Sequence, residues 1–153
     1  MTRRAPTSIM LLAFALTFGL AGLASSTGVE SPAAWEAAAA YLAGLPEGFN
    51  GIRGEVLKAK LDAGEATFLL DVHQPNEFAA GRIEGALNIP VREVPKAMDK
   101  IPSDKSAPIV VVCASGIRAA YVVMALNFKG YTDVKDLVGG MAGWEKAGYQ
   151  VVK

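Results

Sequence analysis

The protein has 153 residues, of which 15 are basic and 15 acidic, with one histidine and one cysteine. This balanced charge, without a basic run after the N-terminal segment, disfavours nucleic acid and anionic membrane surfaces as partners. A lone cysteine cannot form an intramolecular disulfide, so the thiol is free, paired with another chain, or functional.

The first 26 residues have the layout of a secretory signal peptide. Arg3 and Arg4 precede an apolar run from Ile9 to Ala24, and small residues follow it. Because this run is shorter than the roughly 20 residues of a membrane span, we expect cleavage near its end rather than a retained anchor. The sequence therefore predicts a periplasmic or secreted protein with no stable membrane insertion after cleavage. The remaining chain is long enough for one domain.

Residues 27–51 form a predicted N-terminal extension that contains a short helix. Ser31 can cap this helix, Pro32 suits its first turn, and Gly44 marks its end. From residue 52 the pattern becomes regular, and we assign residues 52–153 to a single domain.

Short apolar runs alternate with helical segments throughout this domain. The predicted strands are 67–72, 85–90, 109–113 and 134–138, and the predicted helical segments are 54–64, 74–81, 92–101, 118–130 and 141–148. In segment 118–130 the apolar residues predicted on one stripe are Ala120, Val123, Met124 and Phe128. Strands alternating with helices predict an α/β fold with a mostly parallel sheet between helices.

Cys113 ends strand 109–113 and begins a short loop of small residues. Reactive groups collect at the carboxyl ends of parallel strands, where loops meet the starts of the next helices. The backbone N–H groups of such a loop can turn inward to hold an anion, and a helix start stabilises a thiolate. A cysteine after β-branched residues is often plain core, but a core strand needs neither Gly116 nor Arg118 at this spacing. We therefore predict that Cys113 is an ionised, accessible nucleophile, with substrate-binding residues Ala114, Ser115, Gly116, Ile117 and Arg118.

Four segments taken in order are more specific than any one alone: LLDV followed by NEF, then GRIEGALNIP, CASGIR and LVGGMAGW. With these segments the chain resembles the rhodanese family of sulfurtransferases from Ile52 to its C-terminus. The resemblance implies a three-layer α/β/α sandwich with a five-stranded, mainly parallel sheet, in which the strand of Asp71 lies beside that of Cys113. It also implies that Cys113 takes a sulfane sulfur from a small anionic donor such as thiosulfate, holds it as a persulfide, and passes it to cyanide or a thiol.

The loop and its surroundings refine this resemblance. Four residues separate Cys113 from Arg118, as in sulfur-transferring members, whereas the related phosphatases have one more; phosphatase activity is therefore a minor alternative. This chain has His73 where members usually carry arginine, Arg82 where histidine is common, and neutral Ala114 where thiosulfate-using relatives are often basic. We expect thiosulfate to bind less well here.

The residues predicted to support the loop are Asp71, His73 and Arg82. Asp71 is expected to accept hydrogen bonds from the active loop or to pair with an arginine. Glu77 and Arg82 are interpreted as structural ion partners, with Arg82 a further candidate for the mouth of the pocket. His73 shares the strand end with Asp71, which leaves open a thiol hydrolase in which His73 acts as general base for Cys113. A second alternative is a non-catalytic rhodanese-like module that binds a partner or carries sulfur within a complex.

The remaining motifs predict no cofactor. One cysteine and one histidine do not make a metal site without carboxylates at fitting spacing, and no glycine-rich nucleotide fingerprint follows a strand. The pair Gly139 and Gly140 is predicted to allow a tight turn near the active loop, and Met141 and Trp144 are predicted to close the core.

Overall fold

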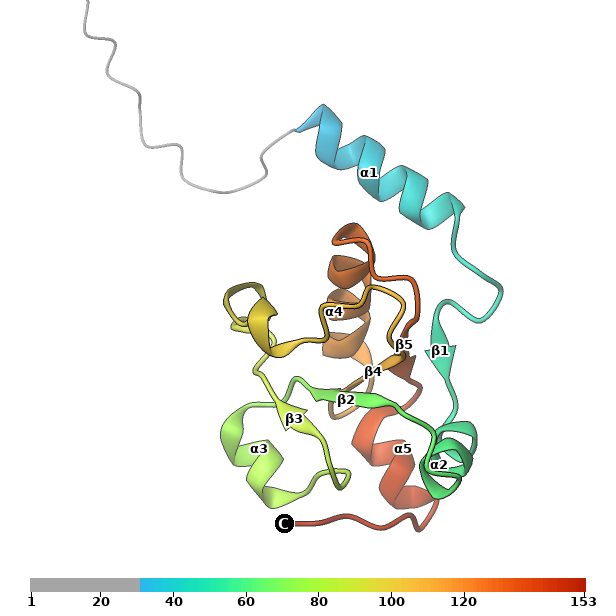
Figure 1. Ribbon diagram of the computed structural model, residues 1–153, viewed down its shortest axis with the longest axis vertical. Coiled ribbons are helices and arrows are strands. Elements are labelled where there is room, and N and C mark those ends of the chain that lie inside the picture. Colours follow the sequence, from blue (N-terminus) through green and yellow to red (C-terminus); the bar gives the residue numbers. More distant parts are fainter. Residues whose placement is uncertain (1–30) are drawn as a thin grey trace, which may run out of the picture. The chain divides into compact units, whose positions relative to one another are not determined.

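Helices and strands alternate along residues 31–153, the part of the chain that the computed structural model describes (Figure 1). The predicted signal peptide lies outside these described residues. The helices are α1 (Pro32–Ala43), α2 (Gly54–Asp62), α3 (Pro75–Ala80), α4 (Ile117–Phe128) and α5 (Gly140–Lys146). The strands are β1 (Gly51–Ile52), β2 (Phe68–Asp71), β3 (Leu87–Asn88), β4 (Ile109–Val112) and β5 (Val134–Leu137).

The five strands form one parallel sheet in the order β1-β5-β4-β2-β3. Asp71 of β2 lies in register with Val112 of β4, so the strand of Asp71 runs beside the strand that leads to Cys113. This confirms the neighbour relation that the family resemblance implied. Because every strand is parallel, all the carboxyl ends meet at one edge of the sheet.

Side chains alternate between the two faces of the sheet and build two cores. On one face Val111 and Cys113 of the β4 segment pack with Val123 of α4. On the other face Val110 and Val112 pack with residues of α2 and α5, such as Leu57 and Trp144. Figure 1 shows α2 and α5 together, apart from α4. Helices on both faces of a parallel sheet are the three-layer sandwich predicted above.

The buried face of α4 differs from the predicted stripe. The buried residues are Ala119, Val122, Val123 and Leu126, whereas Ala120 is exposed and Phe128 is half exposed. The helix is apolar around most of its circumference, so periodicity alone could not identify the face that packs on the sheet.

The sequence predicts a helix over 92–101 that Pro95 interrupts early, and the structure has two single turns of 3-10 helix there, Val94–Lys96 and Met98–Lys100. Pro95 lies at the start of the first turn and lacks the N–H that an α-helix would need. The buried Val94 and Ala97 are spaced by three residues, which suits a 3-10 turn better than a longer α-helix.

Helix α1 forms as predicted, but it buries none of its side chains. The Ser31 side chain accepts a hydrogen bond from the Ala34 N–H and so caps the helix. Its contact with the domain includes an edge-to-face pair between Tyr41 and Phe128, with ring centroids 5.5 Å apart. No helix between residues 31 and 153 is both long and apolar enough to cross a bilayer.

The core at β2 predicts a specific loss of stability on truncation. Leu70 is completely buried between β4 and β3, so we expect Leu70→Ala to lower the free energy of unfolding by about 3 kcal/mol. Leu42→Ala is the matched control, because Leu42 is 59% exposed and its truncation leaves no cavity. Urea denaturation measures the free energy of unfolding of both variants. An equal loss in Leu70→Ala and Leu42→Ala would contradict this account of the core.

Candidate active site

Cys113 sits at the carboxyl end of β4, on the face covered by α4. Its side chain packs in the core of that face and the residue is only 1% exposed. The Gly116 N–H donates to its Sγ over 3.2 Å, so one loop amide points at the sulfur as predicted. The predicted accessibility is not seen, because the loop folds over the thiol.

Gly116 has a left-handed backbone with φ +97° and begins α4. A Cβ built there would lie 3.1 Å from Oδ2 of Asp136, which belongs to β5. Glycine at this position therefore satisfies the backbone conformation and leaves room for the carboxylate behind the loop. Only Gly116 lets the loop turn tightly enough to bring its N–H onto the sulfur.

The start of α5 braces the Cys113 loop through its backbone. The Met141 N–H donates to the Cys113 carbonyl over 2.8 Å, and the Ala142 N–H donates to the Ala114 carbonyl over 3.0 Å. A Cβ on Gly140 would lie 2.2 Å from the Cys113 carbonyl oxygen, so no other residue fits there. The predicted tight turn at Gly139 and Gly140 is confirmed, and its purpose is this close approach.

Arg118 forms a two-point ion pair with Glu77 of α3. Its two terminal nitrogens donate to the two carboxylate oxygens over 2.7 and 2.8 Å. Hydrogen bonds from Arg118 and from the Gln74 backbone lower the pKa of Glu77 to about 2, and the Glu77 carboxylate raises the pKa of Arg118. The ion partner of Glu77 is therefore Arg118, and an anionic substrate would have to compete with Glu77 for this guanidinium.

Asp71 and His73 are both buried and bind one another. The His73 ring Nδ1 lies 2.9 Å from Asp71 Oδ1, and the His73 N–H donates to the same oxygen over 2.9 Å. Asn88 of β3 donates from its side chain to the carbonyl oxygens of Asp71 and His73. The expectation that Asp71 bonds the active loop or an arginine is wrong, because its oxygens are taken by His73 and Asn88. Among residues 31–153, no hydrogen bond joins His73 to Cys113, so the hydrolase alternative gains no support.

Arg82 lies apart from the Cys113 loop. Its guanidinium carbon is 4.9 Å above the ring of Phe78, and its backbone pairs with Val152 in an antiparallel bridge. The C-terminal segment is thereby tied to the end of α3. Arg82 does not line the cleft beside the loop.

A cleft of about 350 Å³ opens beside Ala114 of the loop. Its walls include His73 and Glu77 on one side and Met141 and Glu145 of α5 on the other. This cleft lies at the carboxyl edge of the sheet, next to the only thiol of the chain. Such an edge is where parallel α/β folds bind their ligands.

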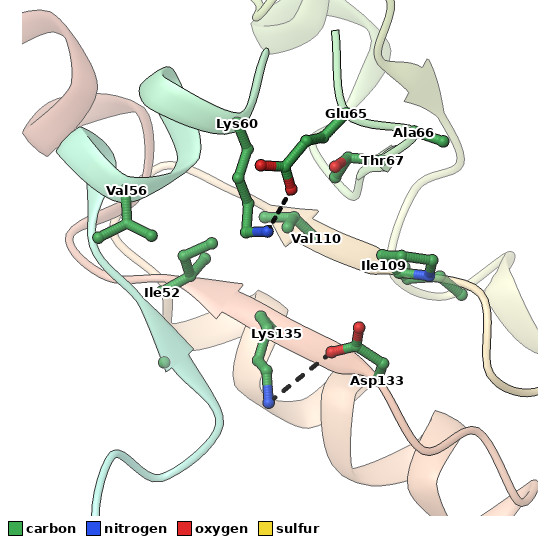
Figure 2. Close-up of a pocket in the computed structure, with 12 residues that line it drawn as sticks. Ile52, Val56, Lys60, Glu65, Ala66, Thr67, Ile109, Val110, Asp133 and Lys135 are labelled. Atoms are coloured by element: carbon green, nitrogen blue, oxygen red, sulfur yellow. Dashed lines mark hydrogen bonds and ion pairs between the residues drawn. The ribbon is translucent and has the colours of Figure 1, made fainter. Parts of the chain in front are cut away.

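A second hollow of about 330 Å³ lies at the amino ends of the strands (Figure 2). Ile52 and Val110 lie in it, and the pairs Lys60–Glu65 and Lys135–Asp133 border it, at 2.6 and 3.9 Å. The strand β4 separates this hollow from the Cys113 loop by about 13 Å, at about 3.3 Å per residue. It therefore takes no part in chemistry at the thiol.

No three histidine, cysteine, aspartate or glutamate residues gather as a metal-binding group within residues 31–153. The polar contacts of Cys113, Asp71 and His73 described above are all to protein groups. The arrangement offers a covered thiol, one loop amide that donates to its sulfur, and a cleft beside the following residue. These parts suit a sulfur nucleophile that forms a covalent intermediate.

Comparison with known proteins identifies the family. A family model described as Rhodanese-like domain matches residues 54–147. The chain belongs to the rhodanese-like domain family. A sulfurtransferase of Allochromatium vinosum is 35% identical over 103 residues, which cover 67% of this chain and 94% of that protein. The crystal structure of a rhodanese-related protein from Thermoplasma volcanium has a TM-score of 0.60 and 31% identity, covering 67% of this chain and 96% of that one.

A further relative widens the range of functions within the rhodanese-like family. The putative sulfur carrier protein YrkF of Bacillus subtilis is 30% identical over 90 residues, which cover 59% of this chain and 48% of that protein. The relatives thus include both sulfurtransferases and a sulfur carrier. This rhodanese-like protein is a member of a family that transfers or carries sulfur.

Sequence reasoning missed two residues of this rhodanese-like site. Asn88 holds the Asp71–His73 pair, and Asp136 places a carboxylate behind Gly116. Oδ1 of Asp136 is buried and has no hydrogen-bond partner in the described part of the chain. Neither residue follows a motif that marks a ligand. Only the sheet order, which puts β5 and β3 on either side of β4 and β2, brings them to the site.

The close approach at Gly140 predicts a large steric effect. We expect Gly140→Ala to lower the free energy of unfolding by about 3 kcal/mol or more, because its Cβ would collide with the loop backbone. Gly85→Ala is the matched control: Gly85 also has positive φ, +80°, but nothing lies within 4 Å of a Cβ there. We expect about 1 kcal/mol for this control, from backbone strain alone. Equal losses in urea denaturation would contradict the steric explanation.

Asp136 predicts a pH dependence of stability. Burial raises the pKa of its carboxyl from 3.8 to about 6. Because the folded pKa lies above the unfolded one, ionisation favours unfolding, and the stability that Asp136 contributes is lost as pH rises from about 4 to about 7. Solvent screens this partly buried group, so we expect Asp136→Asn to gain about 1 kcal/mol at pH near 7.5 and nothing at pH near 3.5.

Urea denaturation at the two pH values measures the Asp136 effect. Asp133→Asn is the control, since Asp133 precedes the same strand with a side chain that is 46% exposed and has Lys135 3.9 Å away. A gain in Asp136→Asn of the same size at both pH values would show that packing, and not ionisation, is responsible.

Proposed function

We propose that this protein is a sulfurtransferase in which Cys113 carries sulfur as a persulfide between a small sulfane donor and a nucleophilic acceptor. The observation that carries the proposal is the Gly116 N–H aimed at Cys113 Sγ at the mouth of the sheet. Membership of the rhodanese-like family and a 35% identical sulfurtransferase support it. The donor is thiosulfate or a similar sulfane compound, and the acceptor is cyanide or a thiol.

The first half-reaction transfers one sulfur atom to the protein. The Cys113 thiolate attacks the outer sulfur of thiosulfate, a new S–S bond forms, and the old S–S bond breaks with its electron pair leaving on sulfite. Cys113 is left as an anionic persulfide. Its negative charge needs hydrogen-bond donors, and the loop amides together with the start of α4 supply them.

The second half-reaction restores the thiolate. Cyanide, or the thiolate of an acceptor, attacks the outer sulfur of the persulfide, and the electron pair of the breaking S–S bond returns to Cys113. Thiocyanate or an acceptor persulfide is released. No electrons enter or leave the system, so no redox cofactor is needed.

Arg118 has a positioning role in this proposal. Its guanidinium ties the start of α4 to α3 through Glu77, which fixes the helix that follows the loop. The bond of Arg118 to Glu77 leaves the loop amides as the main contacts for a charged sulfur. This arrangement fits the expectation that thiosulfate binds less well here than in relatives with a basic loop.

Intact-mass spectrometry tests the proposal directly. After incubation with thiosulfate, we expect the protein to gain one sulfur atom, and we expect no gain in Cys113→Ser. Addition of cyanide should then remove the added mass and release one equivalent of thiocyanate. Absence of any sulfur adduct with several sulfane donors would contradict the proposal.

A sulfur-carrier role is the second candidate, because a protein named as a putative sulfur carrier, YrkF, is among the relatives. A carrier would also form the Cys113 persulfide, but it would not turn over with small acceptors. Repeated thiocyanate release under excess thiosulfate and cyanide therefore separates the two. Export by the predicted signal peptide, and hence a periplasmic or secreted location, remains part of the proposal.

A further inference from the structure

The cleft beside Ala114 has one wall, the start of α5, that is hydrogen-bonded to the Cys113 loop. The Met141 N–H is bonded to the Cys113 carbonyl over 2.8 Å, and Glu145 follows Met141 by one helical turn. The Glu145 side chain therefore lies on the same side of α5 as Met141, whose N–H donates to the loop. Both residues line the cleft, together with Ala114.

Glu145 reaches across the cleft to the end of α3. Its Oε1 lies 3.7 Å from the place where a Cβ of Gly81 would be. A Cβ at position 81 would also lie 2.9 Å from the Val151 side chain, so the chain is tightly packed around Gly81. The carboxylate is thus presented to the cleft from α5 while its oxygen approaches α3.

The charges of the cleft do not balance. Glu77 is neutralised by the two-point bond from Arg118, and the ring of His73 is bonded to the Asp71 carboxylate. The lining of the cleft includes no lysine or arginine, and no ion pair of Glu145 is found within residues 31–153. Glu145 is therefore the carboxylate of the cleft lining that has no ion partner within residues 31–153.

We propose that this cleft is the acceptor subsite and that Glu145 makes it select small thiols that carry an ammonium group over anionic thiols. The inference rests on the proposed function, since an acceptor is needed only if Cys113 carries sulfur. A molecule in the cleft lies beside Ala114, the residue that follows Cys113 in the chain. In this proposal its thiol attacks the outer sulfur of the persulfide from that position. Its ammonium group then meets Glu145, whereas a carboxylate there is repelled.

The size of the cleft agrees with this substrate class. Its volume of about 350 Å³ lies at the small end of the range for ligand sites, which suits a small molecule with a short chain between thiol and amine. The reaction is the second half-reaction above: the acceptor thiolate attacks the outer sulfur, and Cys113 leaves as the thiolate.

A single-turnover experiment tests the selection. The protein is loaded with sulfur by thiosulfate, freed of donor by gel filtration, and mixed with cysteamine, 2-mercaptoethanol or mercaptoacetate. These thiols share a two-carbon frame and differ in charge. Loss of the added sulfur, followed by intact mass, gives a second-order rate constant for each. The quantity compared is the ratio of the cysteamine to the mercaptoacetate rate constant in each variant, because intrinsic thiol reactivity cancels between variants.

We expect Glu145→Gln to lower this ratio by about fivefold at low ionic strength, with a smaller effect at high salt. Glu47→Gln is the matched control, since Glu47 is an exposed carboxylate in the segment before β1, at the amino ends of the strands; it should keep the wild-type ratio. An unchanged ratio in Glu145→Gln on protein that loads and releases sulfur would overturn this inference alone. Failure of Cys113 to load any sulfur would overturn the proposed function and the inference with it.

Discussion

The backbone contact between Gly140 and the Cys113 loop is the constraint on which the site depends. The loop carbonyls of Cys113 and Ala114 accept hydrogen bonds from the first residues of α5, and only a residue without a Cβ lets the two segments approach so closely. With its carbonyls held in this way, the loop turns its Gly116 N–H toward the sulfur. The shape of the site is therefore set by main-chain atoms of the segments that follow two neighbouring strands, β4 and β5.

This arrangement explains how a nearly buried thiol can be a candidate nucleophile. Cys113 is 1% exposed, and the Gly116 N–H at the start of α4 donates to its sulfur. Among the side chains near the loop, Arg118 is bonded to Glu77 and His73 to Asp71. Oδ1 of Asp136 has no hydrogen-bond partner within residues 31–153. The Gly116 N–H contacts the sulfur directly, and Cys113 adds to the larger effect of Glu77 in raising the pKa of Arg118.

Two carboxylates near the loop have opposite effects on stability. Glu77 gains two hydrogen bonds from Arg118, so its pKa falls and its charge is stabilised in the folded protein. Asp136 is placed behind Gly116, where burial raises its pKa to about 6 and makes its charge costly. Such a cost at a site is common where geometry is fixed by other requirements, in this case by the turn at Gly116.

The sequence by itself determined the α/β class, the parallel strands 109–113 and 67–72, and Cys113 at a strand end, because continuous apolar runs and a small-residue loop are local patterns. It did not determine the buried face of α4, since an apolar helix has no distinctive stripe, nor the 3-10 turns around Pro95. The partners of Arg118, Asp71 and Asp136 were decided only by the tertiary structure. Those contacts join residues from different strands and helices, and the order β1-β5-β4-β2-β3 that brings them together leaves no periodic mark in the sequence.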